Sequence, residues 1–116
     1  MQQESSKKTS LGKKGEELAS RYLEKQGVKI IERNFRCNIG EIDLIGLIDE
    51  YLVFVEVKSR AEADVFVNPL ISLTKAKCNR LRRLGEYYRT RFHLLHKQPR
   101  FDAVGITYQK GDNFSI

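Results

Sequence analysis

The chain has 116 residues, of which 41% are hydrophobic and 31% are charged, and its formal net charge is +6. This length is enough for one modest core, and the composition excludes a disordered chain. The first ten residues are polar, and acidic residues interrupt the longest apolar stretch, 42–57, so we expect neither a signal peptide nor a transmembrane helix. Cys37 and Cys78 lack metal-ligand spacing, which predicts free thiols and a cytoplasmic location, and without a transmembrane helix we expect no membrane partner.

Positive charge is concentrated in one segment. Residues 75–91 contain seven basic residues and one acidic residue, so this segment alone carries a charge equal to the whole net charge. A concentrated basic face is the electrostatic signature expected of a protein that binds a phosphate backbone. A helix face kept soluble by arginine explains the same charge equally well, so the charge alone does not decide between the two.

The pattern of apolar residues predicts six elements after a polar tail. Residues 1–10 are expected to form a flexible tail, and residues 11–116 a single domain. The first element is a helix at 11–26 that starts at Thr9 or Ser10 and stops at Gly27. Its predicted apolar stripe contains Leu11, Gly15, Leu18, Ala19, Tyr22 and Leu23. The remaining elements are strands at 28–35, 41–48 and 51–58, a basic helix at about 73–91 and a strand at 100–108.

The order α-β-β-β-α-β predicts an α/β fold with a mixed sheet flanked by helices. Three consecutive strands form an antiparallel meander, and the fourth, reached across a helix, can lie parallel to a neighbour. Helices before and after the meander can cover its two faces. That explains why residues 53–57 are apolar on both sides of the strand, apart from Glu56.

The hairpin between the second and third strands brings charged residues together. If residues 49–50 form the centre of the turn, Asp43 lies opposite Glu56 and Glu41 lies opposite Lys58. Directly opposed side chains hold their Cβ atoms ~4.5–5.5 Å apart, so two acidic residues there repel each other. Charges within an apolar strand are costly unless they are paired or bound to a metal. We therefore expect a cation between Asp43 and Glu56.

The ligands available at this hairpin are oxygen atoms, which favour Mg²⁺ or Mn²⁺ over zinc. Asp43 and Glu56 offer carboxylates, the backbone carbonyl of Val57 is a further candidate ligand, and Glu16 could approach from the first helix, directly or through water. Such an ion polarises a phosphodiester and lowers the pKa of a bound water, the expected nucleophile. Lys58 would position or deprotonate that water, or neutralise charge on the phosphate.

An ordinary structural explanation competes with this site. Lys58 could simply pair with Glu41 and Glu56, which would leave Asp43 at a solvated strand end. An E-x-K pattern by itself favours that explanation. The additional acidic residue at position 43 and the basic helix elsewhere in the chain favour the metal site.

Basic residues outside the hairpin are candidates for contacts with nucleic acid. They are Lys75, Lys77, Arg80, Arg36 and Arg100. Lys77 either reaches a phosphate at the edge of the site or extends along its apolar neighbours to water. Arg100 shares a strand face with Asp102, so the two form a supporting ion pair or contact a substrate. Tyr87 and Phe92 could stack on bases, but their spacing favours the core.

The motifs of this hairpin resemble those of a known family. G-E-I-D-L-I at 40–45, followed by V-F-V-E-V-K-S-R at 53–60, is similar to the bacterial YraN-type family, an uncharacterised group with a restriction-endonuclease-like, Holliday-junction-resolvase-like fold. The resemblance spans most of the chain. It also includes Gly15-Glu16, Ala19, Tyr22-Leu23, Arg33-Asn34, Arg36, Lys77, Arg80-Leu81 and Arg100-Phe101-Asp102.

The resemblance implies a nuclease core of the D…E-x-K type. In that core Asp43, Glu56 and Lys58 are the metal-binding and catalytic residues, and Glu16 is the acidic residue on the helix. The implied topology is the same α-β-β-β-α-β order that the apolar pattern predicts.

Three functions are compatible with these features. The first is a Mg²⁺- or Mn²⁺-dependent nuclease, a phosphodiesterase that acts on DNA or RNA, with DNA favoured. The second is a non-catalytic nucleic-acid-binding module that keeps the fold within a larger assembly. The third is an interaction domain whose charged hairpin face contacts a protein. A domain of this length that cuts both strands is expected to act as a homodimer.

Overall fold

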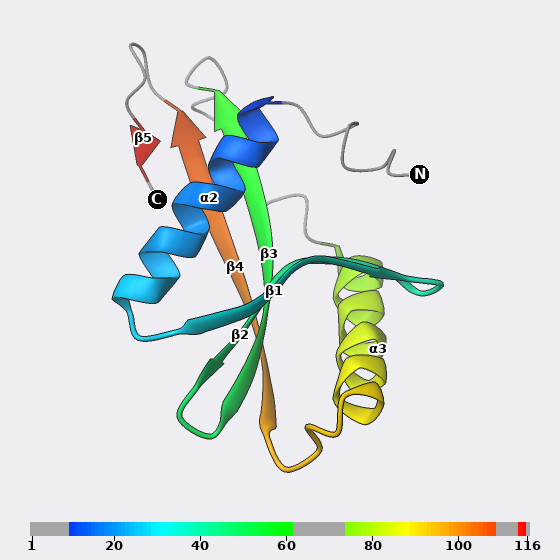
Figure 1. The fold of residues 1–116 in the computed structure, drawn as a ribbon. Helices are drawn as coiled ribbons and strands as arrows, with labels where there is room; N and C mark the ends of the chain where they lie inside the picture. Colours follow the sequence, from blue (N-terminus) through cyan, green and yellow to red (C-terminus); the bar gives the residue numbers. More distant parts are fainter. Residues whose placement is uncertain (1–9, 62–73, 109–113, 116) are drawn as a thin grey trace.

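The structure is a computed structural model that describes residues 10–61, 74–108 and 114–115 (Figure 1). Its elements are α2 (Ser10–Lys25), β1 (Lys29–Cys37), β2 (Gly40–Ile48), β3 (Tyr51–Ala61), α3 (Lys75–Arg91), β4 (Gln98–Tyr108) and β5 (Phe114–Ser115). The predicted order of helices and strands is therefore confirmed, with one short strand added at the end. Residues 1–9 of the predicted tail lie outside the described residues, and Ser10 begins α2.

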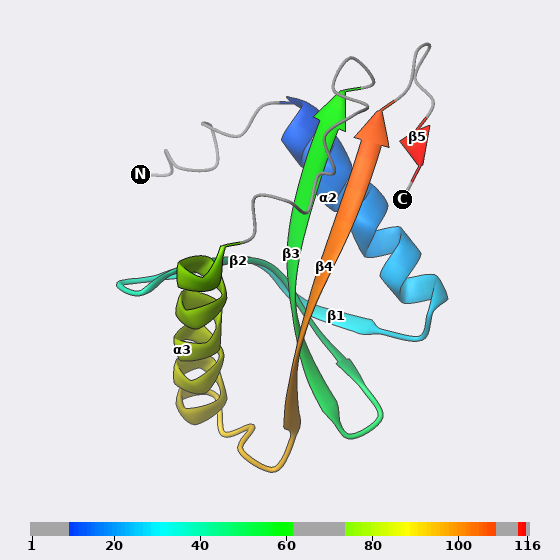
Figure 2. The same ribbon diagram turned by 180° about the vertical axis from the view of Figure 1, so that it is seen from behind.

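The strands form one mixed sheet in the order β1-β2-β3-β4-β5. β1, β2 and β3 are an antiparallel meander, β4 runs parallel to β3, and β5 pairs antiparallel with β4. Figures 1 and 2 show α2 across one face of the sheet and α3 beside the other. The predicted α/β layout is confirmed. The strand β5 was not predicted because two residues are too few to show an alternating pattern.

The helix α2 lies on the sheet through small side chains. Ala19 is fully buried and joins a core that includes Leu23 from the same helix and Leu44, Val53 and Val55 from the sheet. The helix stops where Gly27 adopts a positive φ of 98°, and the Gly27 N–H bonds to the carbonyl of Glu24. A glycine in this conformation is the usual end of a helix because it has no Cβ to strain.

The buried face of α2 differs from the predicted stripe. Glu16 is 8% exposed and Ser20 is fully buried, whereas Tyr22 is 41% exposed. The prediction that Tyr22 faces the core is therefore wrong. The helix presents Gly15, Ala19 and Ser20 to the sheet, and these small residues permit a closer approach than a tyrosine would.

The helix α3 closes the other face of the sheet. Thr74 caps its start, where the side-chain oxygen accepts a hydrogen bond from the Lys77 N–H at 3.1 Å. Leu84 and Tyr88 join a second core with sheet residues that include Phe54. Neither described helix has the length and apolar content of a membrane-spanning segment. Both predicted free thiols, Cys37 and Cys78, are confirmed.

Candidate active site

The candidate site lies where β2 and β3 separate. The paired residues of these strands run from Ile48 with Tyr51 to Leu44 with Val55, which confirms the predicted turn and alignment. Within the described residues, the ladder includes no pair beyond Leu44 and Val55. The predicted direct pairs of residues 43 with 56 and 41 with 58 are therefore not part of it.

Beyond the last ladder pair, the carboxylate of Asp43 on β2 makes the contact with the β3 backbone. Its Oδ2 accepts a hydrogen bond from the Val57 N–H at 2.8 Å, across the gap between the two strands. Asp43 is 8% exposed, so this charged hydrogen bond is partly shielded from water. The side chain is thus held at the point where the strands diverge, with Glu56 next to its bonding partner in the sequence.

The course of β2 changes at the same residue. Ile42 is buried in the core under α3, whereas Leu44, two residues later, is buried in the core under α2. In a regular strand these two side chains would point to the same face. The pairing of β1 with β2 also skips Asp43 and its would-be partner Asn34, which has a positive φ of 53°. A local rotation of the hairpin β1–β2 therefore sets the direction of Asp43.

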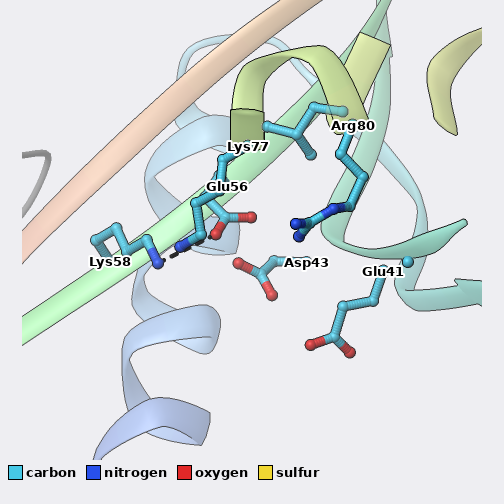
Figure 3. A pocket seen from close by; sticks show the side chains of 8 residues that line it. Glu41, Asp43, Glu56, Lys58, Lys77 and Arg80 are labelled. Atoms are coloured by element: carbon cyan, nitrogen blue, oxygen red, sulfur yellow. Dashed lines mark ion pairs between the residues drawn. The ribbon is translucent and has the colours of Figure 1, made fainter. Parts of the chain in front are cut away.

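A pocket of about 280 Å³ opens at this divergence. It is lined by Gly40, Glu41, Asp43, Glu56, Lys58, Lys77, Arg80 and Leu81. Figure 3 shows Asp43 from β2, Glu56 from β3 and the basic side chains of Lys77 and Arg80 from α3 pointing toward one another, whereas the Glu41 carboxylate points away. The structure thus brings together Asp43, Glu56 and Lys58, as predicted, with Lys77 and Arg80 from the predicted nucleic-acid-binding set.

Glu56 lies in an unfavourable environment for a negative charge. Burial, and after it the charge of Asp43, raise the pKa of the Glu56 carboxyl above its ordinary value of 4.5. The Lys58 Nζ lies 3.3 Å from Glu56 Oε2 and offsets only part of this effect. The Glu56 carboxylate is therefore less stable as an anion here than it would be in water.

Two lysine side chains meet beside Glu56. Burial lowers the pKa of Lys58, but a hydrogen bond with Lys77 and the charges of Glu56 and Asp43 outweigh burial and raise it. The same hydrogen bond, followed by burial and the charge of Lys58, lowers the pKa of Lys77. The two amines therefore titrate as an interacting pair, with the pKa of Lys58 raised and that of Lys77 lowered.

The predicted structural alternative is only partly formed. Lys58 pairs with Glu56, as that alternative requires. Glu41 instead pairs with Arg36 on β1, with 3.0 Å between Arg36 Nη2 and Glu41 Oε1. Asp43 is buried and hydrogen-bonded rather than placed at a solvated strand end.

Two predicted nucleic-acid contacts lie near the pocket without lining it. Arg36 is partly exposed and is held by Glu41, which does line the pocket. Lys75 is exposed in the first turn of α3, two residues before Lys77. Both remain candidates for contacts with a substrate that extends beyond the pocket.

Arg100 lies on the other face of the sheet. The pairing of β3 with β4 places Asp102 beside Val55, whose side chain is buried under α2. Arg100 pairs with Asp102 at 3.0 Å, and its guanidinium lies 5.3 Å from the centre of the Tyr51 ring. Of the two roles that the sequence left open for Arg100, the structure forms the ion pair with Asp102. Arg100 does not line the pocket.

Glu16 is not part of a preformed cluster of ligands. Among the described residues, no group of three or more acidic, histidine or cysteine side chains could hold one metal ion. Asp43, Glu56 and Glu16 are thus not assembled as a three-carboxylate set. Glu16 lies on α2, which packs on the face of the sheet opposite to α3, and it is not among the residues that line the pocket.

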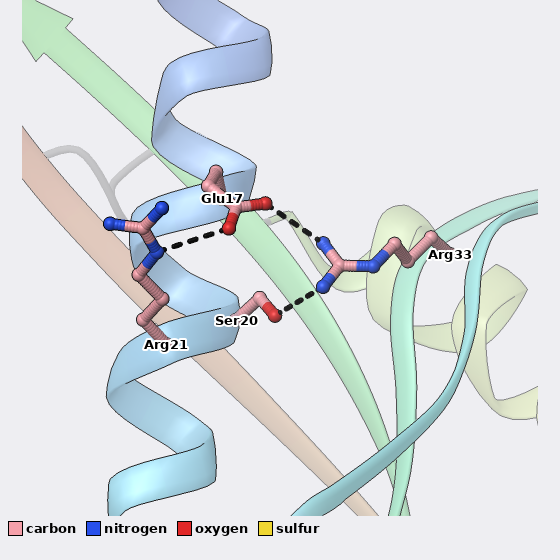
Figure 4. A network of polar contacts seen from close by, with 4 residues as sticks. All are labelled: Glu17, Ser20, Arg21 and Arg33. Atoms are coloured by element: carbon pink, nitrogen blue, oxygen red, sulfur yellow. Dashed lines mark hydrogen bonds and ion pairs between the residues drawn. The ribbon is translucent and has the colours of Figure 1, made fainter.

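Sequence reasoning missed two structural supports of the site. Arg33 donates a 2.7 Å hydrogen bond to Ser20 Oγ and lies 3.5 Å from Glu17, which ties β1 to α2 (Figure 4). Gly40 allows α3 to approach the β1–β2 turn, because a Cβ there would lie 3.0 Å from the Arg80 Cδ. The only sign of this close approach in the sequence was the glycine at position 40, directly before Glu41.

Comparison with known proteins identifies the family. Residues 15–106 match the model of a family described as "Uncharacterised protein family UPF0102". The chain belongs to this family. The match includes all the residues that line the pocket, and UPF0102 is the YraN family that the hairpin motifs resemble.

Relatives from several bacteria match most of the chain. A UPF0102 protein of Marinobacter nauticus is 45% identical over 116 residues, which are 100% of this chain and 92% of the relative. A UPF0102 protein of Clostridium perfringens is 41% identical over 85% of this chain and 80% of its own length. A third, from Renibacterium salmoninarum, is 41% identical over 90% of this chain and 88% of its own length.

Proposed function

We propose that this UPF0102 protein is a Mg²⁺- or Mn²⁺-dependent phosphodiesterase that acts on nucleic acid. The observation that carries the proposal is the convergence of Asp43, Glu56, Lys58, Lys77 and Arg80 on one pocket. Two carboxylates can hold a hard cation, and three basic groups can hold a phosphate beside it. Five further basic residues of α3 lie outside the pocket and extend its positive charge, which supports a polyanionic substrate.

The donor atoms of the pocket suit a hard divalent cation. Glu56 has a raised pKa because it is buried and lies near Asp43, and a bound cation would relieve that repulsion. Magnesium is commonly held by one or two protein carboxylates and takes its other ligands from water and substrate phosphates. Two carboxylates, with the Val57 carbonyl as a further donor, are therefore sufficient. When bound, the ion supplies Lewis-acid activation of the phosphodiester and lowers the pKa of an attacking water.

The basic residues then have separate roles. Arg80 offers a planar guanidinium that can bind two phosphate oxygens at once. Lys58 stays protonated and can stabilise negative charge that develops on the phosphate. Lys77 reaches the same pocket from α3 and adds a second amine beside the phosphate, although its contact with Lys58 and burial lower its pKa. This division refines the sequence-based role of Lys58, which included proton removal.

One observation favours a second candidate, a non-catalytic nucleic-acid-binding module. The ammonium group of Lys58 already lies 3.3 Å from Glu56 and partly neutralises it. If this pair persists in the presence of divalent ions, the pocket binds phosphate without binding metal. Metal binding therefore separates the two functions.

The test combines metal binding with cleavage. Thermal unfolding is followed across a Mn²⁺ series for the wild type, Asp43→Asn and Asp49→Asn. Asp49 is a matched control, since it is an exposed carboxylate at the far end of the same hairpin, and asparagine tolerates its positive φ of 52°. A ligand that binds only the folded state at 100 times its Kd stabilises it by about 2.7 kcal/mol. We expect that shift in the wild type and in Asp49→Asn but not in Asp43→Asn.

Cleavage is measured with Mn²⁺ on labelled single-stranded, duplex, flapped and four-way DNA. We expect Glu56→Gln and Lys58→Ala to lower the rate by roughly 100-fold or more, and Asp49→Asn to leave it unchanged. Activity that survives both substitutions would come from a contaminant and would refute the assignment. Salt-dependent DNA binding without a Mn²⁺ shift would instead support the non-catalytic module.

A further inference from the structure

A second cavity lies beside the candidate active site. It has a volume of about 500 Å³ and is lined by Cys37, Asn38, Ile39 and Tyr87. The next residue along the turn, Gly40, lines the first pocket. Both cavities therefore border the same β1–β2 turn, and α3 contributes to the wall of each. The volume of the second cavity lies within the ~300–1,000 Å³ typical of small-molecule sites.

The Tyr87 ring is 39% exposed and lies at the edge of a cluster of aromatic rings. Its centroid lies 6.3 Å from that of Phe35, with the two planes tilted by 33°. Phe35 in turn makes edge contacts with Tyr88 at 5.0 Å and Phe92 at 6.3 Å. Tyr88 is buried, and its hydroxyl donates a 2.9 Å hydrogen bond to Glu32 on β1. An exposed aromatic ring with this support loses little conformational entropy when a flat ligand stacks on it.

Positive charge and aromatic surface alternate along this side of α3. Arg80 and Tyr87 are seven residues apart, so they lie on nearly the same side of the helix, about 10 Å apart along its axis. Arg83, which is exposed, lies one turn from each of them. Arg91 follows one turn after Tyr87, with its guanidinium 5.1 Å from the centre of the Phe92 ring. Cationic groups beside an exposed ring are the combination that binds single-stranded nucleic acid.

We propose that the cavity beside Tyr87 binds an unpaired nucleobase of the strand whose phosphate lies between Lys77 and Arg80. Neighbouring phosphates are about 3.4 Å apart along the axis of a stacked strand, so ~10 Å spans about three stacked nucleotides and fewer in an extended strand. A base inside an intact duplex is stacked on its neighbours and cannot reach Tyr87. The substrate class is therefore a strand with unpaired bases. This inference rests on the proposed function only in taking the first pocket as a phosphate site.

The experiment compares a natural with an abasic strand in EDTA, where no metal-dependent cleavage occurs. Fluorescence anisotropy measures binding of a labelled single-stranded 12-mer of thymidine and of a 12-mer with the same phosphates but no bases. The variants are Tyr87→Ala and Tyr87→Phe. Tyr22→Ala serves as the matched control, because Tyr22 is equally exposed but lies on α2, which covers the other face of the sheet.

We expect the wild type to bind the natural strand more tightly than the abasic strand. Tyr87→Ala should weaken binding of the natural strand by roughly 5- to 150-fold, the usual effect of losing one aromatic–base stack. It should leave abasic binding and the salt dependence unchanged, because it removes no phosphate contact. Tyr87→Phe and Tyr22→Ala should bind like the wild type, whereas Arg80→Ala should weaken both strands and reduce the salt dependence.

Equal binding of the natural and abasic strands by the wild type would overturn the inference, and this comparison needs no variant to fold. An equal loss on both strands in Tyr87→Ala would overturn it as well, and so would wild-type affinity of that variant for the natural strand. The two proposals fail separately. Base-dependent binding without Mn²⁺-dependent cleavage would refute only the proposed phosphodiesterase activity. Cleavage without base-dependent binding would refute only the proposed stacking site at Tyr87.

Discussion

Replacing Gly85 with alanine tests how closely α3 lies on the sheet. In an isolated helix alanine is favoured over glycine by about 1 kcal/mol. In this protein a Cβ at position 85 would lie 2.9 Å from Phe101 Cζ and 3.2 Å from Phe54 Cε2. Phe54 is fully buried, and its ring stacks on that of Phe101 with centroids 5.3 Å apart. Forcing an extra carbon into such a contact typically costs about 1–3 kcal/mol.

The two effects oppose each other, so we expect Gly85→Ala to destabilise the protein by about 0–2 kcal/mol instead of stabilising it. Urea unfolding of the wild type, Gly85→Ala, Phe101→Leu and the double variant measures the coupling. Phe101→Leu removes the nearest ring, so in that background the alanine should be neutral or stabilising. If Gly85→Ala alone raises the free energy of unfolding by the full ~1 kcal/mol, α3 does not lie as close to the sheet as the structure places it.

Three further predictions concern the site and its supports. Glu56→Gln should raise the free energy of unfolding in EDTA at pH 7, because burial and the neighbouring carboxylate raise the pKa of Glu56 in the folded protein. Ionisation of this group therefore costs stability as pH rises through the folded pKa, and the advantage of the glutamine should vanish in urea titrations below about pH 4.5. Arg33→Ala should lower the free energy of unfolding by about 1–3 kcal/mol in thermal or urea unfolding, because it removes the hydrogen-bond donor to the fully buried Ser20. Arg21 also pairs with Glu17 but is exposed, so the control Arg21→Ala should cost under ~0.5 kcal/mol. Equal losses in the two variants would contradict the role of the buried hydrogen bond. Tyr88→Phe should lose about 0.5–3 kcal/mol with its hydrogen bond to a half-buried glutamate, and an unchanged urea midpoint would show that the bond is not formed in solution.

The hairpin was predictable because its information is local. Two polar residues between apolar runs indicated the turn at 49–50, and alternation then aligned Leu44 with Val55. That alignment indicated that Asp43, Glu56 and Lys58 lie close together, and they line one pocket although the predicted direct pair of residues 43 and 56 is not part of the ladder. The bond from Val57 to Asp43 was not predictable, because it arises where the strands have already separated.

Features that depend on how distant segments meet were predicted less well. The sequence indicated that Arg100 and Asp102 share a face but not which face, because the pairing of β3 with β4 is set by the whole crossover through α3. The rotation of α2 placed Glu16 and Ser20 inside and Tyr22 outside, since contact with the sheet, rather than hydropathy, decided which side of the helix is buried.

The sequence by itself determined the order of the elements, the α/β class, the turn of the central hairpin and the charged residues gathered at it. These depend on short-range periodicity and on turn residues, which act within a few positions of one another. Only the tertiary structure decided the rotation of the strand at Asp43, the pairing of Glu41 with Arg36, the side of the sheet that holds Arg100 and the cavity beside Tyr87. The pairing of Glu41 with Arg36 depends on the register of the β1–β2 hairpin. Each of the others requires segments far apart in the chain to pack against each other, and the geometry of that packing is a property of the whole sheet.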